Sequence, residues 1–230
     1  MQDIVKALFG DKKFNEKHRL GAVNSINWAR ILAQTVYYFF SYFRVQAIYP
    51  GARIQYVVPT GNFGDVLAGY YAKRMGLPMD KLVIGTNSND ILARFWKTGR
   101  YERVELASEV GAVPGNGVPD GEKPVVTVKE TFSPAMDILV SSNFERLLWY
   151  LAYEVEGGRG DAACAVVDGW MKNVKSNGRV EVPRGVLELA KRDFTAERVS
   201  DDQVRIFEIC RPMGVQRAVY PDLGNDTEVL

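Results

Sequence analysis

IQYVVPTGNFGDVLAGYYAKRMGLPMDKLVIGT, residues 54–86, holds two short apolar segments joined by a glycine-bearing turn and a helical segment. The apolar segments, Ile54–Val58 and Leu82–Thr86, are rich in β-branched residues and are typical of buried strands. Between them, Val66–Met75 repeats apolar residues at helical spacing, and Gly76-Leu77-Pro78 ends that helix. A strand, a helix and a strand joined by brief turns predict an α/β fold with a parallel sheet.

The flanking segments extend this α/β pattern. Asn87–Asp90 is predicted to cap a helix over Ile91–Lys97. Upstream, Asn24 and Ser25 are predicted to cap a helix whose apolar stretch, Ile31–Phe43, is too short to span a bilayer, so we expect a buried helix there. One short helix, followed by a polar turn around Gly10-Asp11, is predicted within the first twenty residues. Further helical segments are predicted over Phe144–Val155 (capped by Ser141-Ser142-Asn143), Ala162–Val174, Pro183–Ala190 and Val204–Cys210. The expected fold class is therefore a three-layer α/β fold, a mostly parallel sheet flanked by helices.

The composition narrows the classes of partner and of chemistry. The 230 residues are 47% hydrophobic and 25% charged, with a formal net charge of +1. These values are ordinary for a globular protein and give no overall attraction to nucleic acid or to a membrane surface. His18 is the only histidine, which argues against a Ser-His-Asp triad and against a zinc site. The first residues, MQDIVKALFG, do not resemble a signal peptide, and we expect a cytoplasmic protein.

The turn Gly61–Asp65, between the first strand and its helix, is a candidate phosphate site. Its two glycines allow the backbone to approach a ligand closely. Amides at the start of a helix favour an anion, and parallel sheets bind ligands at the carboxyl ends of their strands. A Gly-x-x-Gly turn is also common as a plain tight turn, and the residues alone leave both interpretations open.

A second candidate site surrounds the start of the preceding helix. Asn24 and Ser25 are polar residues at a helix start, and Asn27 and Arg30 are spaced so that they share one helix face. The guanidinium group of arginine has a planar set of donors suited to an oxyanion. An ordinary cap followed by a surface arginine explains the same residues. Together the two sites favour a protein that binds two phosphates, or one ligand with two anionic groups.

The chain resembles the threonine synthases, especially the fungal type, which are fold-type II pyridoxal-phosphate enzymes. The resemblance covers most of residues 2–200 and is to the C-terminal part of these proteins. The blocks that carry it are AVNSINWARILAQTVYYF (22–39), VVPTGNFGDVLAGYYAKRMGLP (57–78), TNSNDILARFWKTGRYER (86–103), SPAMDILVSSNFERLLWYLAYE (133–154) and KRDFTAERVS (191–200).

The resemblance implies a role for each candidate site. The family are lyases of threonine biosynthesis that use pyridoxal 5'-phosphate to convert O-phospho-L-homoserine and water into L-threonine and phosphate. Asn24, Ser25 and Arg30 would then bind the phosphate of the substrate, or of another small phosphorylated ligand. The cofactor phosphate would be held by Gly61, Asn62, Phe63, Gly64 and Asp65.

Two departures from the family pattern are visible. The Schiff-base lysine of the family lies in a Phe-Lys-Asp type motif, in a half that precedes the matched blocks, and this sequence has no such motif. The family's final Pro-His-Thr-Ala type segment is also absent. Lys73, Lys97 and Lys129 are present, but none lies in the required motif. We therefore expect the 230 residues alone to be inactive.

The domain organisation follows from the same comparison. Residues 1–200 are assigned to the C-terminal part of the pyridoxal-phosphate-binding catalytic region, and residues 201–230 to a divergent tail. The Gly- and Pro-rich segment 105–123 is expected to form a surface loop. One interpretation is an enzyme of which this chain is a fragment, and the alternative is a non-catalytic phosphate-ligand-binding or interaction protein. Surfaces that the missing half normally covers are expected to cause self-association.

Overall fold

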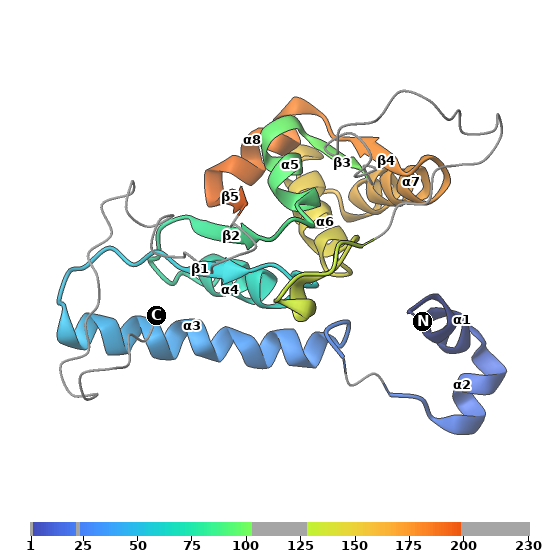
Figure 1. The fold of residues 1–230 in the computed structure, drawn as a ribbon, viewed down its shortest axis with the longest axis horizontal. Helices are drawn as coiled ribbons and strands as arrows, with labels where there is room; N and C mark the ends of the chain where they lie inside the picture. Colours follow the sequence, from blue (N-terminus) through green and yellow to red (C-terminus); the bar gives the residue numbers. More distant parts are fainter. Residues whose placement is uncertain (1, 22–23, 103–127, 199–230) are drawn as a thin grey trace.

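The computed structural model describes residues 2–21, 24–102 and 128–198 (Figure 1). A short 3-10 helix, Pro134–Met136, precedes α6. The remaining helices and strands are, in chain order, α1 (Gln2–Gly10), α2 (Lys12–His18), α3 (Trp28–Ile48), β1 (Val57–Pro59), α4 (Gly64–Arg74), β2 (Leu82–Thr86), α5 (Ile91–Thr98), β3 (Arg100–Glu102), α6 (Phe144–Val155), α7 (Gly160–Asn177), β4 (Arg179–Glu181), α8 (Arg184–Asp193) and β5 (Phe194–Arg198).

A parallel sheet in the order β1-β2-β5 lies at the centre of the fold. Its register aligns Val57 with Val83 and Leu82 with Phe194. All five residues of the middle strand, β2, are buried, as its unbroken apolar sequence predicts for a strand covered on both faces. A separate antiparallel pair is formed by β3 and β4. The predicted fold class, a mostly parallel sheet flanked by helices, is confirmed.

The helices pack on this sheet around an aromatic core. α4 contacts β1 and β2, α5 contacts β2 and β5, and α3 lies along α4 (Figure 1). Phe63, Phe95, Phe144 and Phe194 come from four different parts of the chain and are fully buried. The ring of Phe144 lies 5.5 Å from that of Phe63 and 4.9 Å from that of Phe95, between centroids. This cluster fixes the starts of α4 and α6 relative to each other.

Several predicted elements have the predicted bounds, among them the strand at residues 82–86 and the helix at residues 144–155. The first strand is shifted: it was expected over Ile54–Val58, whereas β1 covers Val57–Pro59. The carbonyls of Ile54 and Tyr56 each accept a single bond of 2.8 Å, from Asp80 N–H and Val83 N–H. These isolated bonds do not extend the ladder, whose first aligned pair is Val57 with Val83.

The expectation of a buried helix over Ile31–Phe43 is wrong. α3 buries only Ile31, Thr35 and Tyr38, a narrow stripe at helical spacing. Large apolar side chains on its other faces are exposed, with 60% of Val36 and 67% of Phe40 accessible. The reason is that α3 packs mainly on one neighbour, α4. Within the described ranges, no helix has the length and apolar character needed to cross a membrane.

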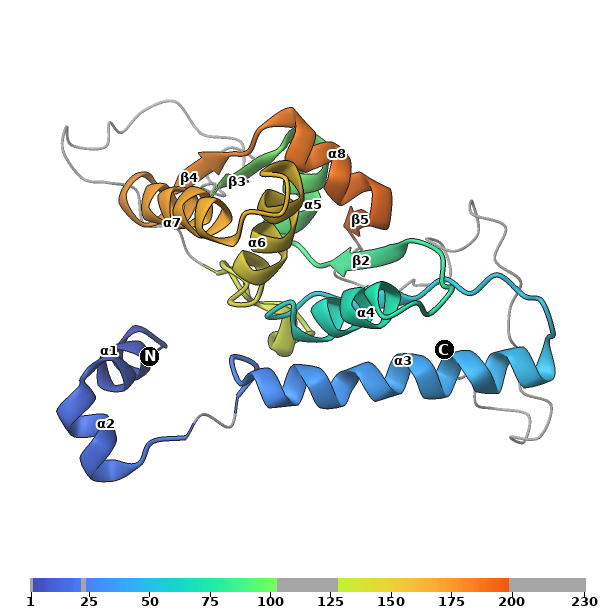
Figure 2. The ribbon, with the colours of Figure 1, turned by 180° about the vertical axis from the view of Figure 1, so that it is seen from behind.

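The first twenty residues form two helices, α1 and α2, where one short helix was expected. Asp11 separates them because its carboxylate accepts from Phe14 N–H at 3.1 Å and so caps α2. The two helices contact each other and stand apart from the rest of the described chain in both views (Figure 1, Figure 2). The predicted loop at residues 105–123, the helix at residues 204–210 and the tail at residues 201–230 lie outside the described residues.

Candidate functional site

The turn Gly61–Asp65 connects the carboxyl end of β1 to the start of α4. It begins with two backbone bonds, from Thr60 N–H to Gly85 O at 3.0 Å and from Phe63 N–H to Thr60 O at 2.7 Å. Gly61 and Phe63 both have left-handed backbones, with φ of +44° and +63°, which turn the chain sharply into the helix. No side chain of the described residues caps α4. Uncapped amides at the start of a helix are the groups that bind anions, so the turn remains a candidate phosphate site.

The Phe63 side chain holds this turn against the core. Its side chain is fully buried, and its ring lies 5.5 Å from Phe144, 6.4 Å from Trp96 and 6.4 Å from Phe194. Packing in the aromatic core compensates for the unfavourable left-handed backbone of a non-glycine residue. Phe63 therefore shapes the turn from within the core, and its backbone N–H is already used in the bond to Thr60 O.

Two buried side-chain oxygens of the turn, Asn62 Oδ1 and Asp65 Oδ1, have no hydrogen-bond partner among the described residues. Burial raises the pKa of the Asp65 carboxyl above its ordinary value of 3.8. The Tyr38 hydroxyl donates to the backbone carbonyl of Asp65 at 2.9 Å. Burial also raises the pKa of Tyr38, so this hydroxyl stays protonated and remains a donor. Unsatisfied buried polar atoms are unusual in native proteins and recur at functional sites.

The second predicted site, residues 24–30, forms a tight turn followed by the first turn of α3. The cap of α3 is Asn27, whose Oδ1 accepts from Ala29 N–H at 2.9 Å, so the predicted cap at Asn24 and Ser25 is wrong. Asn24 instead closes the preceding turn by accepting from Ile26 N–H at 3.1 Å. Arg30 is exposed on the helix, and its backbone N–H donates to Asn27 O at 3.1 Å.

The structure brings part of this second turn against the first. A Cβ atom added at Gly64 would lie 3.9 Å from Ser25 Cβ, 3.6 Å from Gln34 Oε1 and 3.7 Å from Asn143 Nδ2. Polar side chains from three other parts of the chain therefore surround the start of α4. The two candidate turns are therefore neighbours at the start of α4.

Asn143 was missed by the sequence reasoning as a site residue. α6 begins at Phe144 as predicted, but the Asn143 side chain makes no capping bond to it. Its Nδ2 donates instead to Ser25 O at 2.8 Å and to Asn62 O at 3.0 Å. Ser141 Oγ donates to Gly61 O at 2.9 Å. The polar run before α6 is visible in the sequence, but its contacts lie about 80 and 118 residues away along the chain.

A third polar group lies at the carboxyl end of β2. Asn87 Nδ2 donates to Asp137 Oδ1 at 2.7 Å and to Thr131 Oγ1 at 3.0 Å. Asp137 Oδ2 accepts from Thr131 N–H at 2.8 Å. The loop that carries Thr131 and Asp137 reaches the candidate phosphate turn, since a Cβ at Gly61 would lie 3.4 Å from Ala135 O. Asp137 therefore organises the loop beside the site.

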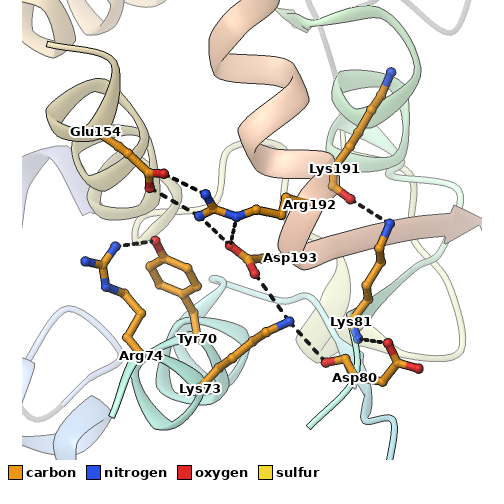
Figure 3. Close-up of polar contacts among 9 residues, drawn as sticks. All are labelled: Tyr70, Lys73, Arg74, Asp80, Lys81, Glu154, Lys191, Arg192 and Asp193. Carbon is orange, nitrogen blue, oxygen red and sulfur yellow. Dashed lines mark hydrogen bonds and ion pairs between the residues drawn. The ribbon is translucent and has the colours of Figure 1, made fainter. Parts of the chain in front are cut away.

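Two of the lysines considered as catalytic groups lie at the far ends of their helices. Lys73 is in the last turn of α4, nine residues or roughly 14 Å along the axis from Gly64. Its Nζ pairs with Asp193 at 3.3 Å, within the network that also contains Arg192 and Glu154 (Figure 3). Lys97 is exposed in the last turn of α5. Both lysines are held away from the candidate site.

Comparisons with known proteins show which family the chain resembles. No family model matches the chain. It is 55% identical over 204 residues to threonine synthase from Schizosaccharomyces pombe, which covers 88% of this chain and 38% of that protein.

Two solved structures are similar as well. The crystal structure of yeast threonine synthase has a TM-score of 0.71 and 52% identity, over 87% of this chain and 35% of that one. The structure of threonine synthase from Brucella melitensis with bound pyridoxal phosphate has a TM-score of 0.67 and 37% identity, over 93% of this chain and 40% of that one. The chain thus spans well under half the length of these three proteins. From this agreement in sequence and in structure, the chain belongs to the threonine synthase family.

Proposed function

We propose that this chain provides the two phosphate-binding turns of a pyridoxal-phosphate-dependent threonine synthase. Gly61, Asn62, Phe63, Gly64 and Asp65 bind the cofactor phosphate, and Asn24, Ser25 and Arg30 bind the phosphate of O-phospho-L-homoserine. The observation that carries the proposal is the amino end of α4, which no described side chain caps and which lies directly beside Ser25.

The chemistry of the two turns suits two different phosphates. The turn at residues 61–65 offers backbone amides and the positive end of a helix dipole, which suit a group that stays bound through the reaction. The other turn offers a hydroxyl from Ser25 and a guanidinium from Arg30, which suit a phosphate that must leave. Bound pyridoxal phosphate would supply the electron-accepting ring. The residues of this chain would hold and orient both phosphates at one edge of the sheet.

The proposal includes that the 230 residues alone have no turnover. The family's chemistry requires a lysine to join the cofactor and to move protons. Lys73 and Lys97 lie at the far ends of α4 and α5, and Lys73 is paired with Asp193. The same observation favours the alternative function, a non-catalytic protein that binds pyridoxal phosphate or another phosphorylated ligand without joining it covalently.

Replacing Gly64 by alanine tests the cofactor site. The added methyl group would make only ordinary contacts of 3.6–3.9 Å, so the fold should tolerate it. It would, however, occupy space between the two turns beside the amides of α4. We expect pyridoxal phosphate, titrated into the full chain and followed by its absorbance, to bind at least about tenfold more weakly to Gly64→Ala than to the unchanged chain.

Gly185→Ala is the matched control, because Gly185 also lies in the first turn of a helix, α8, but has nothing within 4 Å of an added Cβ. Both substitutions should preserve the fold, since alanine is the better helix former by about 0.5–1 kcal/mol. Equal binding by all three proteins, or none by the unchanged chain, would refute the cofactor site. Phosphate release from O-phospho-L-homoserine by the same preparation would refute the expected lack of turnover.

A further inference from the structure

The two candidate phosphate turns are joined by one buried side chain. Asn143 is 1% exposed, and its amide group makes bonds to both turns. Nδ2 donates to Ser25 O at 2.8 Å in one turn and to Asn62 O at 3.0 Å in the other. The backbone N–H of Asn143 also donates to Asn62 O, at 3.1 Å. Both donor hydrogens of the side chain are therefore used to hold the turns together.

Arg146, one helical turn further along α6, fixes the orientation of this amide. Its Nη1 donates to Asn143 Oδ1 at 2.9 Å, and its Nη2 donates to Ile26 O at 2.8 Å, in the turn that contains Ser25. Because a guanidinium group can only donate, the oxygen of the amide must face Arg146. The nitrogen must then face the two carbonyls. Asn143 and Arg146 thus bind both turns through three backbone carbonyls, those of Ser25, Ile26 and Asn62.

We infer that Asn143, oriented by Arg146, is a positioning residue that couples the two phosphate turns. The inference rests on the proposed function, because it concerns the same two sites. Asn143 has no spare donor for a ligand and acts only through the backbone of the turns. When a phosphate fixes the conformation of one turn, the shared amide of Asn143 fixes that of the other. The second phosphate then binds without a further loss of conformational entropy in its own turn. The coupling is reciprocal, so either ligand strengthens the binding of the other.

The geometry distinguishes this role from ordinary helix capping. A cap would direct the Asn143 side chain at the first amides of α6, and it makes no such bond. A residue that only stabilises the fold would lower the melting temperature when replaced and would leave the coupling between the ligands unchanged. A positioning residue changes the coupling itself.

The coupling can be measured with pyridoxal phosphate and inorganic phosphate as probes on the full chain. The dissociation constant of inorganic phosphate at residues 24–30 is obtained from amide chemical shifts, first without and then with saturating pyridoxal phosphate. The ratio of the two constants is the coupling factor. Repulsion between the two bound anions is the same in every variant. Differences between the coupling factors of the variants therefore measure only the bridge, meaning the hydrogen bonds that Asn143 and Arg146 make to the two turns.

Two variants remove the bridge in different ways. Asn143→Ala deletes both side-chain donors. Arg146→Lys keeps the positive charge, but its single nitrogen cannot replace the two guanidinium nitrogens that bind Asn143 Oδ1 and Ile26 O. Asn173→Ala, at an exposed position on α7, is the control. We expect the coupling factor of the unchanged chain and of Asn173→Ala to exceed that of Asn143→Ala by at least about fivefold. The factor of Arg146→Lys should fall in between.

The outcomes separate this inference from the proposed function. If the unchanged chain binds pyridoxal phosphate but all variants have the same coupling factor, the inference fails and the proposed function stands. If it binds no pyridoxal phosphate, both fail. Should Asn143→Ala not fold, Arg146→Lys decides alone, because Arg146 is only half-buried. If Arg146→Lys then has the same coupling factor as the unchanged chain, the inference is overturned.

Discussion

Asp65 is a half-buried carboxylate at the start of α4, and its buried Oδ1 has no hydrogen-bond partner within the part of the chain that the structure describes. Two effects oppose each other there. Burial penalises the negative charge, while a hydrogen bond from the Tyr38 hydroxyl favours it. Burial has the larger effect, because the pKa of Asp65 is raised above its ordinary value of 3.8. Between pH 3.8 and this raised pKa the folded chain holds a proton that the unfolded chain has released, so stability falls as the pH rises through that window.

Asp65→Asn should therefore raise the melting temperature at pH 7. The amide keeps the shape of the side chain but needs no buried charge. Below pH 3.8 the carboxyl is protonated in both states, and the gain should disappear. Thermal unfolding of both proteins between pH 3 and pH 8 measures this difference. Asp161→Asn, at an exposed position in the first turn of α7, is the control and should give no gain at pH 7.

At the scale of elements, the packing of α3 on α4 depends on a glycine. A Cβ at Gly69 would lie 2.7 Å from two ring atoms of Tyr38, closer than side chains can pack. Tyr38 cannot easily move away, because its hydroxyl donates to Asp65 O and its carbonyl accepts from Tyr56 Oη, each at 2.9 Å. Gly69 therefore allows the close contact through which α3 reaches the start of α4.

Gly69→Ala should destabilise the chain even though alanine is the better helix former. The gain in helix propensity is about 1 kcal/mol, whereas overpacking a core costs typically about 1–3 kcal/mol. We expect a net loss of about 1 kcal/mol, seen as a lower urea midpoint. Gly169→Ala, in α7 with nothing within 4 Å of the added atom, should raise the midpoint instead. An increase for both variants would contradict the close packing of Gly69 on Tyr38.

At the scale of the whole molecule, α3 presents an apolar surface of the kind that soluble proteins usually cover. Trp28, Val36, Phe40 and Phe43 are between 58% and 67% exposed. β1 and β5 are the edge strands of the described sheet. In the longer proteins that this chain matches, additional chain is available to cover such surfaces. In isolation, the α3 surface should pair with a second copy.

We therefore expect the purified chain to sediment above its monomer mass of 25.8 kDa at micromolar concentrations. Val36→Glu combined with Phe40→Lys places an oppositely charged pair four residues apart, which suits an exposed helix and disfavours an apolar contact. This variant should sediment as a monomer. The same two charges at Ala165 and Gly169, exposed on α7, should have no effect. A monodisperse monomer of the unchanged chain would disprove self-association through α3.

The sequence by itself determined the features that depend on neighbouring residues. The apolar run Leu82–Thr86 predicts a buried strand, the pattern over Phe144–Val155 predicts a helix, and the Gly-x-x-Gly turn marks where a helix starts after a strand. The order of the blocks indicated the family. These signals are local, because backbone propensity and apolar spacing act over a few residues.

Only the tertiary structure decided which distant residues meet. The bond from Asn143 to Ser25 joins residues 118 apart, and no pattern near either residue predicts it. The burial that raises the pKa of Asp65, and the exposure of the apolar faces of α3, likewise follow from which helix packs on which. An apolar helix is buried only where the fold supplies neighbours, and a polar side chain caps a helix only where no stronger donor competes for its oxygen, as Arg146 does for Asn143.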